Sequence, residues 1–382
     1  MLQNKQIAIV GGGPGGLTLA RLLQLAGAHV KVYERDASKA SRVQGAIVDL
    51  HFDSGLKVIE KAGLMEPFKA NYIKGADRYR IFDKYGTIHL DEHNKEDNGD
   101  FGDAYFRPEI DRGSLRNMLL DALHPNTVVW DSQFVSMTQD GEGWILTFNN
   151  GTTAKADIVI GSDGARSKIR PYVSDTQTLY CGVTFIQGEI DNPAATCPEI
   201  YELVANGNLV VLGDEKSITV QPRGDGGLTF YAAAKYPEDW TIDASDKDEI
   251  YSFLLEFYEG WNELFFTLFK ACDKFTVRQL NYFPLDQTWE PHSNITIIGD
   301  AAHLMPPSGE GVNTAMLDAL DLSEHLTNGN YNDIQTAIEA FENKMRARSA
   351  VLAQEALESN EVMYGENALA ALVGMLDQRE SL

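Results

Sequence analysis

The chain has 382 residues, which is enough for two or three domains and for a core that encloses a ligand. Its composition is that of a globular protein, with 43% hydrophobic and 23% charged residues, but its net charge of -24 is unusual. Nucleic acids and anionic bilayers are bound through Lys and Arg, so this charge argues against both as partners and favours solubility.

The cysteines and the amino-terminus indicate a compartment. Cys181, Cys197 and Cys272 are scattered and have no C-x-x-C spacing, which argues against a disulfide framework and a zinc site. The first residues lack the basic, apolar and cleavage segments of a signal peptide, and no apolar run is long enough to span a bilayer. We therefore expect a cytoplasmic monomer with reduced thiols and without a metal.

The first elements predict a βαβ unit. Residues 6–10 (QIAIV) are typical of a buried strand, Leu17–Ala26 of a helix that Gly27 ends, and 29–34 (HVKVYE) of a second strand. A glycine loop, residues 11–16 (GGGPGG), joins the first strand to the helix. This order predicts a parallel sheet with covered faces.

Two later strands end in polar turns. Residues 156–161 (ADIVIG) lead into Ser162-Asp163-Gly164, and 295–299 (ITIIG) lead into Asp300. Between them, segments such as 144–148 (WILTF) and 228–234 (LTFYAAA) alternate in hydropathy and favour antiparallel sheet. From residue 314 onward the pattern becomes helical.

These elements predict an α/β fold, with a Rossmann-like nucleotide-binding domain, an inserted β-sheet substrate domain and a C-terminal helix. The nucleotide-binding domain is predicted to be discontinuous, comprising residues 1–72, 98–175 and 275–320. The β-rich substrate domain comprises 73–97 and 176–274, and the helical segment 321–382 bridges the two.

The glycine loop has the spacing of a dinucleotide site. Gly11 permits the tight turn, Gly13 lets the backbone approach a pyrophosphate, and Gly16 allows the helix to pack closely on the strand. The free N–H groups at the helix N-terminus favour phosphate. Glu34, at the end of the second strand, can accept hydrogen bonds from a ribose. The alternatives at this point are NAD, FAD or a glycine-rich turn without a ligand.

The two polar turns resemble the motifs of a known family. Ser162-Asp163-Gly164 is similar to the Asp-Gly motif of the class A flavoprotein monooxygenases. Gly299-Asp300, with Pro306-Pro307 and the segment 309–313 (GEGVN), resembles their Gly-Asp motif. The resemblance implies FAD on the glycine loop, with NADPH or NADH and O2 as co-substrates and a flavin C4a-hydroperoxide that transfers one oxygen atom. The flavin then supplies the chemistry, so no catalytic side chain is expected.

The same resemblance assigns cofactor residues. Asp300 would accept hydrogen bonds from the hydroxylated chain of FAD, and the N–H groups of Gly311, Val312 and Asn313 would face the pyrimidine edge of the flavin. Arg112 would meet FAD away from the glycine loop. For Arg112 the alternative is an ordinary surface arginine, and for Asp163 it is a turn cap.

Further motifs are similar to those of the tetracycline-inactivating branch, over nearly the whole chain. This similarity implies that Arg35 and Arg42 lie near the flavin and the approach of NADPH, and that Asp49 contacts FAD. It also implies that Gln187, Thr229 and Pro307 face the substrate, a polycyclic or aromatic small molecule of the tetracycline kind.

Several positions depart from that branch: the loop after Pro307 is one residue shorter, and Val211 and its neighbours differ. Thr229 stands where the tetracycline enzymes have a histidine that contacts the substrate, and Glu310 replaces a glutamine. Glu310 is expected to point to solvent; the alternative is a carboxylate near the flavin that destabilises its reduced, anionic form.

Four further polar residues are expected to be structural, and two kinds of alternative activity stay open. His51 and His303 are expected to be structural, and Asp318 and Asp321 to form the polar face of a helix. The alternative activities are another flavoenzyme class, an oxidase or a reductase, and a binding protein that has lost the flavin.

Overall fold

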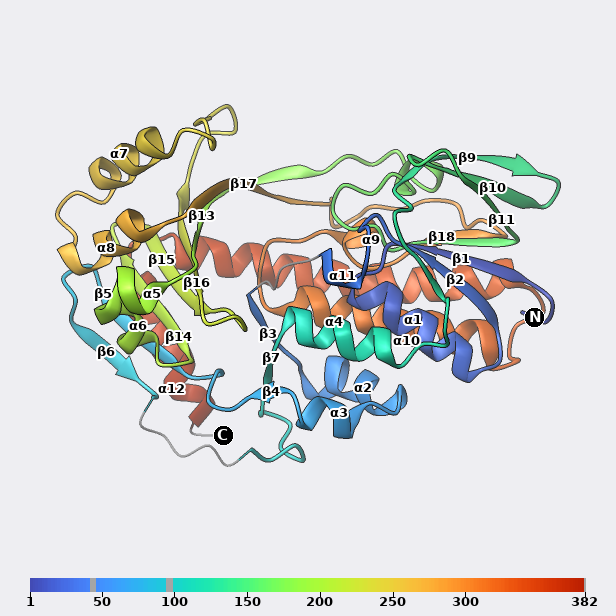
Figure 1. Ribbon diagram of the computed structural model, residues 1–382, viewed down its shortest axis with the longest axis horizontal. Coiled ribbons are helices and arrows are strands. Elements are labelled where there is room, and N and C mark those ends of the chain that lie inside the picture. The colour runs from blue at the N-terminus through green and yellow to red at the C-terminus, as the bar shows by residue number, and fades with distance from the viewer. Residues whose placement is uncertain (42–45, 94–98, 381–382) are drawn as a thin grey trace.

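The computed structural model describes residues 1–41, 46–93 and 99–380, the side chains of 377–380 excepted. The chain forms two lobes joined by long helices (Figure 1). One lobe contains the first helix and a parallel sheet, and the other contains a larger, mostly antiparallel sheet covered by short helices. In the part of the chain described, no helix combines the length and apolarity needed to cross a bilayer.

The first lobe is built on a five-stranded parallel sheet. Its order is β18-β12-β1-β2-β8. The strands are β1 (Gln6–Val10), β2 (His29–Tyr33), β8 (Val128–Val129), β12 (Ile158–Gly161) and β18 (Ile295–Ile297), which confirms the predicted Rossmann-like arrangement. Short apolar strands suit this position because helices cover both faces of a parallel sheet.

Helices and two small sheets complete this lobe. The helices are α1 (Pro14–Leu25), α2 (Lys57–Lys61), α3 (Met65–Lys69), α4 (Arg112–Asp121), α9 (Asp300–His303) and α10 (Glu310–Thr327). A π-helical turn spans Phe52–Leu56, and 3-10 turns span Lys39–Ser41 and Arg170–Tyr172. One small sheet contains β9 (Phe134–Asp140), β10 (Gly143–Phe148) and β11 (Thr153–Ala156); the other contains β3 (Ile47–Asp49), β4 (Tyr72–Ile73) and β7 (Glu109–Asp111).

The second lobe is built on a seven-stranded sheet of order β17-β13-β16-β15-β14-β5-β6. Its strands are β5 (Tyr79–Asp83), β6 (Ile88–Asp91), β13 (Leu179–Ile190), β14 (Asn208–Gly213), β15 (Lys216–Pro222), β16 (Leu228–Lys235) and β17 (Lys274–Tyr282). The antiparallel β16 confirms the alternation seen in residues 228–234. Because β17 belongs to this sheet, the sheet extends past the predicted boundary at residue 274, and the division into domains stays a prediction.

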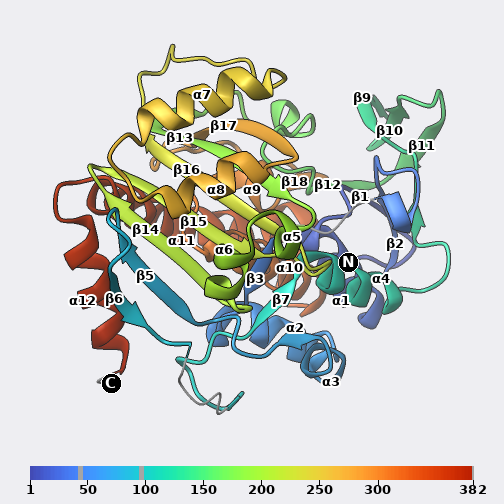
Figure 2. The same ribbon diagram turned by 60° about the vertical axis from the view of Figure 1, so that its left-hand side comes forward.

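Helices cover the two faces of this sheet differently. The helices α5 (Pro193–Thr196), α6 (Pro198–Val204), α7 (Lys247–Phe257) and α8 (Glu263–Ala271) lie on its outer side (Figure 2). Side chains of α6, α7 and α8 pack there against Ile186, Ile218 and Phe230 in one apolar cluster. The opposite face is directed toward the first lobe, and α12 (Ala368–Glu380) covers its β14–β5 end.

The helix α11 (Ile334–Met363) joins the lobes. It runs the length of the molecule, from the parallel sheet to the seven-stranded sheet (Figure 1). Phe341 and Met345 belong to the core of the first lobe, whereas Tyr364, the C-cap of α11, packs with Val183 and Ala233 of the second. With 30 residues it is about 45 Å long, at 1.5 Å per residue.

Candidate functional site

Three glycines of the loop differ in what surrounds them. A Cβ on Gly11 would lie 2.2 Å from the Ser162 carbonyl oxygen, and one on Gly16 would lie 2.2 Å from the Gly11 carbonyl oxygen. Gly11 also has a positive φ of 109°. The chain itself therefore requires these two glycines. A Cβ on Gly13 would meet no atom within 4 Å, so this position borders open space above the N-terminus of α1.

Glu34 lies beside this loop and is buried. Its carboxylate accepts hydrogen bonds from the backbone N–H of Gly12 (2.6 Å) and of Asp36 (3.0 Å). Arg116, which no motif predicted as a site residue, also contacts the loop. It donates to the Gly12 carbonyl oxygen (3.3 Å) and pairs with Asp36 (3.0 Å). The loop and the acid are therefore close together, at the carboxyl ends of β1 and β2, where open α/β sheets bind ligands.

Asp163 follows β12 and holds its own turn together. Its carboxylate accepts hydrogen bonds from the Ser167 hydroxyl (2.6 Å) and from the N–H groups of Lys168 (2.7 Å) and Ile169 (3.3 Å). This is the geometry of the turn-cap alternative. The contact of Asp163 with a cofactor remains a prediction.

Asp300 follows β18 and is the first residue of α9. Its side chain reaches solvent, yet so much protein surrounds it that burial raises the pKa of its carboxyl. Arg112, the exposed first residue of α4, is close enough to act electrostatically on Asp300 and also on Tyr231 of the seven-stranded sheet. Arg112 is therefore in the electrostatic neighbourhood of one residue from each lobe.

Asn313 ties the start of α10 to β3. Its side-chain oxygen accepts hydrogen bonds from the backbone N–H groups of His51 (2.9 Å) and Gly55 (3.2 Å). Its side-chain nitrogen donates to the carbonyl oxygens of Asp49 (3.0 Å) and Gly309 (3.2 Å). The Asn313 side chain is therefore committed to the protein, so only its backbone is left for the predicted role. Gly311 is exposed and Val312 half-buried beside it, within the first turn of α10.

The prediction that Glu310 points to solvent is wrong. Its carboxylate lies 3.2 Å from Nδ1 of His51, and Nε2 of His51 lies 2.7 Å from the Asp49 carboxylate. Burial alone would lower the pKa of His51, but the two carboxylates outweigh it and raise that pKa to about 9. A protonated His51 thus offsets the charges of both acids. The Asp49 carboxylate is therefore paired with His51.

The inner face of the seven-stranded sheet is set by the alternation of its strands. Gln187 of β13 pairs with Tyr231 of β16 and with Thr276 of β17, so these side chains share one face. Phe185 lies on the same face, with its ring 5.7 Å from that of Tyr231. Thr229, two residues before Tyr231, is buried on this face as well. The face is therefore polar and aromatic.

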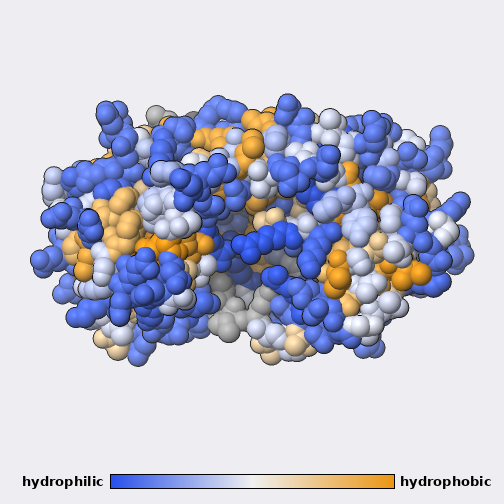
Figure 3. Space-filling view, turned by 90° about the horizontal axis from the view of Figure 1, so that it is seen from above, coloured by the Kyte–Doolittle hydropathy of each residue, from blue (hydrophilic) through white to orange (hydrophobic). Residues whose placement is uncertain are grey.

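The surface between the two lobes is hollowed when the molecule is seen from above, with hydrophilic residues beside the hollow (Figure 3). Arg35 and Pro307 are both exposed, in the loops that follow β2 and α9. Arg42 lies outside the described residues. Gln187 is half-buried and donates to Glu189 (3.3 Å). The roles of these residues toward cofactor and substrate stay predictions.

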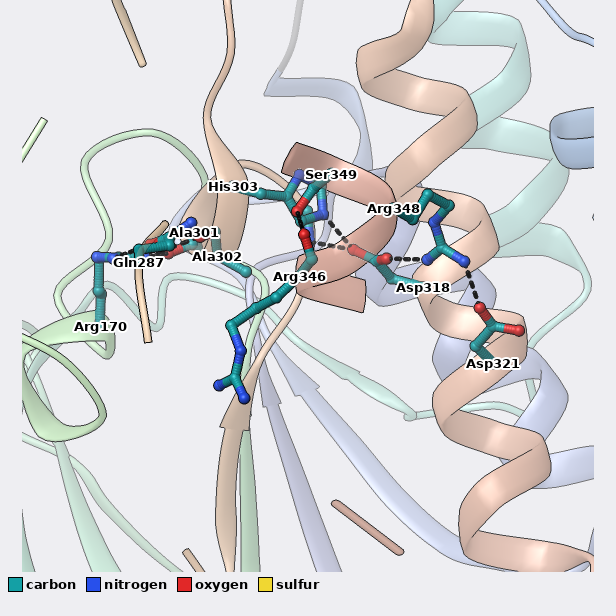
Figure 4. Close-up of polar contacts among 11 residues, drawn as sticks. Arg170, Gln287, Ala301, Ala302, His303, Asp318, Asp321, Arg346, Arg348 and Ser349 are labelled. Atoms are coloured by element: carbon teal, nitrogen blue, oxygen red, sulfur yellow. Dashed lines mark hydrogen bonds and ion pairs between the residues drawn. The ribbon is translucent and has the colours of Figure 1, made fainter. Parts of the chain in front are cut away.

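The interpretation of Asp318 and Asp321 as a polar helix face is wrong. Both are buried, with side chains 0% and 5% exposed. Asp318 contacts His303 and Arg348, and Asp321 contacts Arg348 (Figure 4). Asp321 also contacts Lys344. The apolar residues around them in α10, Met316, Ala319, Leu320 and Leu322, are the signal that this face is turned inward.

The residues present suit FAD. The open space at Gly13, the uncapped N-terminus of α1 and the nearby Glu34 would accept the adenosine and pyrophosphate parts. Asp300 and the first turn of α10, whose cap Gly309 also lacks a side-chain hydrogen bond, would accept the flavin end. Among the described residues, no group of three or more His, Cys, Asp or Glu side chains could hold a metal ion.

The chain belongs to the FAD binding domain family, whose model matches residues 4–354. It is 29% identical over 380 residues to the monooxygenase asqM of Emericella nidulans, with 84% of this chain and 83% of that protein covered. It is 26% identical over 377 residues to the FAD-dependent urate hydroxylase of Mycolicibacterium vanbaalenii, covering 95% and 89% of the two chains. The protein is therefore an FAD-dependent monooxygenase of this family.

The fold is shared with a tetracycline-inactivating enzyme. The crystal structure of the tetracycline destructase Tet(51) aligns with a TM-score of 0.74, covering 98% of this chain and 96% of that one. The identity is 18%, so the likeness is one of fold. The predicted resemblance to the class A flavin monooxygenases is confirmed.

Proposed function

We propose that this monooxygenase uses NADPH or NADH and O2 to insert one oxygen atom into a planar polycyclic or aromatic small molecule. The observation that supports this most is the position of Arg112, which is in electrostatic range of Asp300 on one lobe and Tyr231 on the other. The carboxyl-terminal edge of the parallel sheet, where FAD would bind, would then lie near the inner face of the seven-stranded sheet, which we call the substrate sheet. FAD bound there would supply the oxygen-transfer chemistry.

The side chains of the substrate sheet would orient the substrate. Phe185 and Tyr231 offer two rings against which a planar molecule can pack. Burial raises the pKa of Tyr231, so its hydroxyl stays protonated near neutral pH and can donate a hydrogen bond to the substrate. Gln187 can both donate and accept. A planar substrate rich in carbonyl and hydroxyl groups, of the tetracycline or urate kind, would match this face.

NADPH or NADH would approach from solvent. The chain has one glycine loop, and the resemblance assigns it to FAD, so the reductant has no second loop of this kind. Arg35, exposed after β2, is the described residue best placed to meet its phosphates. A monomer would suffice for this reaction, because the glycine loop, Asp300 and Gln187 all belong to one chain.

The test is oxygen transfer by the full-length protein. The protein is incubated with FAD, NADPH and labelled O2, and tetracycline, urate and simple phenols are tried in turn. We expect substrate-stimulated NADPH consumption and a product heavier by one labelled oxygen atom. Reduction of a substrate without O2 would instead identify a reductase, and substrate oxidation that yields peroxide without NADPH would identify an oxidase.

A matched pair of variants tests the substrate face. Gln187→Leu should raise KM for the active substrate about tenfold, since a lost hydrogen bond to a bound ligand costs about 1.4 kcal/mol. Gln177→Leu, in an exposed loop outside the sheet, should leave KM unchanged. If Gln187→Leu has the same KM as Gln177→Leu, Gln187 does not contact the substrate.

A further inference from the structure

Asp300 is held on a very short element. The helix α9 has four residues, about one turn, and it follows Gly299, which has a positive φ of 61°. A single turn has no stability of its own, because helix nucleation is unfavourable. The direction of the Asp300 carboxylate therefore depends on what holds both ends of α9.

One buried carboxylate holds both ends. Oδ2 of Asp318 accepts a hydrogen bond from the backbone N–H of Gly299 (2.9 Å), before α9. The same oxygen lies 2.5 Å from Nε2 of His303, the last residue of α9. Burial alone would lower the pKa of His303, but the Asp318 carboxylate outweighs it and raises that pKa. A protonated His303 can thus donate to Asp318 while both remain out of water.

Arg348 of α11 holds Asp318 in turn. Its guanidinium donates to Oδ1 of Asp318 (2.6 Å) and to Asp321 (2.5 Å) (Figure 4). Lys344 donates to the second oxygen of Asp321 (2.7 Å). The two carboxylates point toward the same fork of N–H groups, as arginine geometry requires. A hydrogen-bonded path therefore runs from α11 through Asp318 to the turn with Asp300.

The far half of α11 contacts the substrate sheet. Glu361 pairs with Lys235 of β16 (2.7 Å), and Asn360 contacts Cys181 of β13 (3.7 Å). The helix that holds Asp318 is thus fixed to the sheet that would bind the substrate.

We propose that Asp318 and Arg348 are positioning residues for the cofactor site, through which α11 sets the direction of Asp300 and hence the affinity for the flavin end of FAD. The proposal rests on the predicted contact of Asp300 with FAD and is independent of the substrate. It predicts a selective effect of substitutions at these residues. Binding of the flavin half of FAD becomes weaker, while binding of the adenosine half at the glycine loop is unchanged.

The experiment compares FAD with ADP, which shares only the adenosine diphosphate half. Dissociation constants of both are measured on the full-length protein. Arg348→Gln should raise the Kd for FAD about tenfold and leave that for ADP within about twofold, since an affinity difference of 1.4 kcal/mol is tenfold. Arg348→Lys should recover part of the loss, because a lysine can still donate to Asp318.

Two further variants make the outcome decisive. Asp300→Asn should also weaken FAD but not ADP, and this tests the predicted Asp300 contact by itself. Arg346→Gln is the matched control: Arg346 lies on the same helix, but packs on Trp289 and donates to Asn343. Its Kd values should stay at those of the unchanged protein.

The other outcomes overturn the proposal. Equal weakening of FAD and ADP by Arg348→Gln would mean general loss of structure. If Arg348→Gln binds FAD normally and Asp300→Asn binds it weakly, Asp300 contacts FAD but Arg348 does not position it. A selective loss in Arg346→Gln would assign the effect to α11 as a whole. Asp318→Asn is a supporting variant, to be used if it folds, since removing one partner of a buried ion pair is strongly destabilising.

Discussion

At the scale of single residues, the glycine loop separates two reasons for having glycine. Gly11 and Gly16 are required by neighbouring backbone atoms, so a side chain at either would displace the chain itself. At Gly13 nothing in the protein forbids a side chain, and its φ of -80° is one that any residue adopts. A ligand would account for glycine there, because a pyrophosphate must approach the backbone closely.

Gly13→Ala should therefore damage binding and spare folding. We expect the Kd for FAD to rise at least about tenfold, while the free energy of unfolding changes by no more than about 1 kcal/mol. FAD titration and urea unfolding measure the two quantities. Gly374→Ala in α12 is the control, since its Cβ also meets no atom within 4 Å and lies far from the loop in the chain. A normal FAD affinity in Gly13→Ala would contradict the placement of the pyrophosphate.

The residues found from sequence share one property. Gly13, Glu34 and Asp300 all lie just after apolar strands, and the carboxyl ends of parallel strands meet at one edge. Local pattern was enough to predict their place at this edge, and their contacts with FAD stay predictions. Asp318 was misread because its spacing to Asp321 also fits an exposed helix face, and the residue that buries it, Arg348, belongs to another helix. Tyr231 was missed because its partner Arg112 comes from the other lobe.

At the scale of elements, α11 contains a buried acid with a pH-dependent cost. Glu342 is 1% exposed and accepts a hydrogen bond from the Thr296 hydroxyl of β18 (2.7 Å). Burial raises the pKa of its carboxyl to about 7. The folded state therefore keeps a proton that the unfolded state loses near pH 4.5. The contribution of this group to the free energy of unfolding is highest below pH 4.5, falls as the pH rises, and is lost once the pH passes about 7.

Glu342→Gln should stabilise the protein above neutral pH. Gln keeps an oxygen for Thr296 and has no charge to bury. At pH 8 we expect a gain of up to about 3 kcal/mol, at 1.36 kcal/mol per pKa unit, and near pH 4.5 no gain. Urea midpoints between pH 4.5 and 8 measure this, and Glu355→Gln, exposed on the same helix, should show no such trend. A gain that is independent of pH would mean that packing, and not the proton, is responsible.

At the scale of the whole molecule, the two lobes have separate apolar cores, and the C-terminal helices connect them. The core of the first lobe includes Phe341 of α11, whereas Leu376 of α12 packs with Ile81, Val210 and Leu212 of the second. The alternation within 228–234 predicted a strand but not which face would meet the cofactor. That orientation depends on α11 and α12, whose contacts with the sheet join residues distant in sequence, and no local pattern contains them.

Leu376→Ala tests whether α12 supports the second lobe alone. Leu376 is 7% exposed, and truncating a buried leucine costs about 2–5 kcal/mol. We expect a lower urea midpoint with an unchanged Kd for FAD, because α12 contacts β14 and lies outside the parallel sheet. Met375→Ala, 44% exposed on the same helix, should change stability by less than about 0.5 kcal/mol. If Leu376→Ala also weakens FAD binding in the folded protein, the lobes are coupled through α11 and α12. Packing at the far end of the seven-stranded sheet then affects the affinity of the cofactor site.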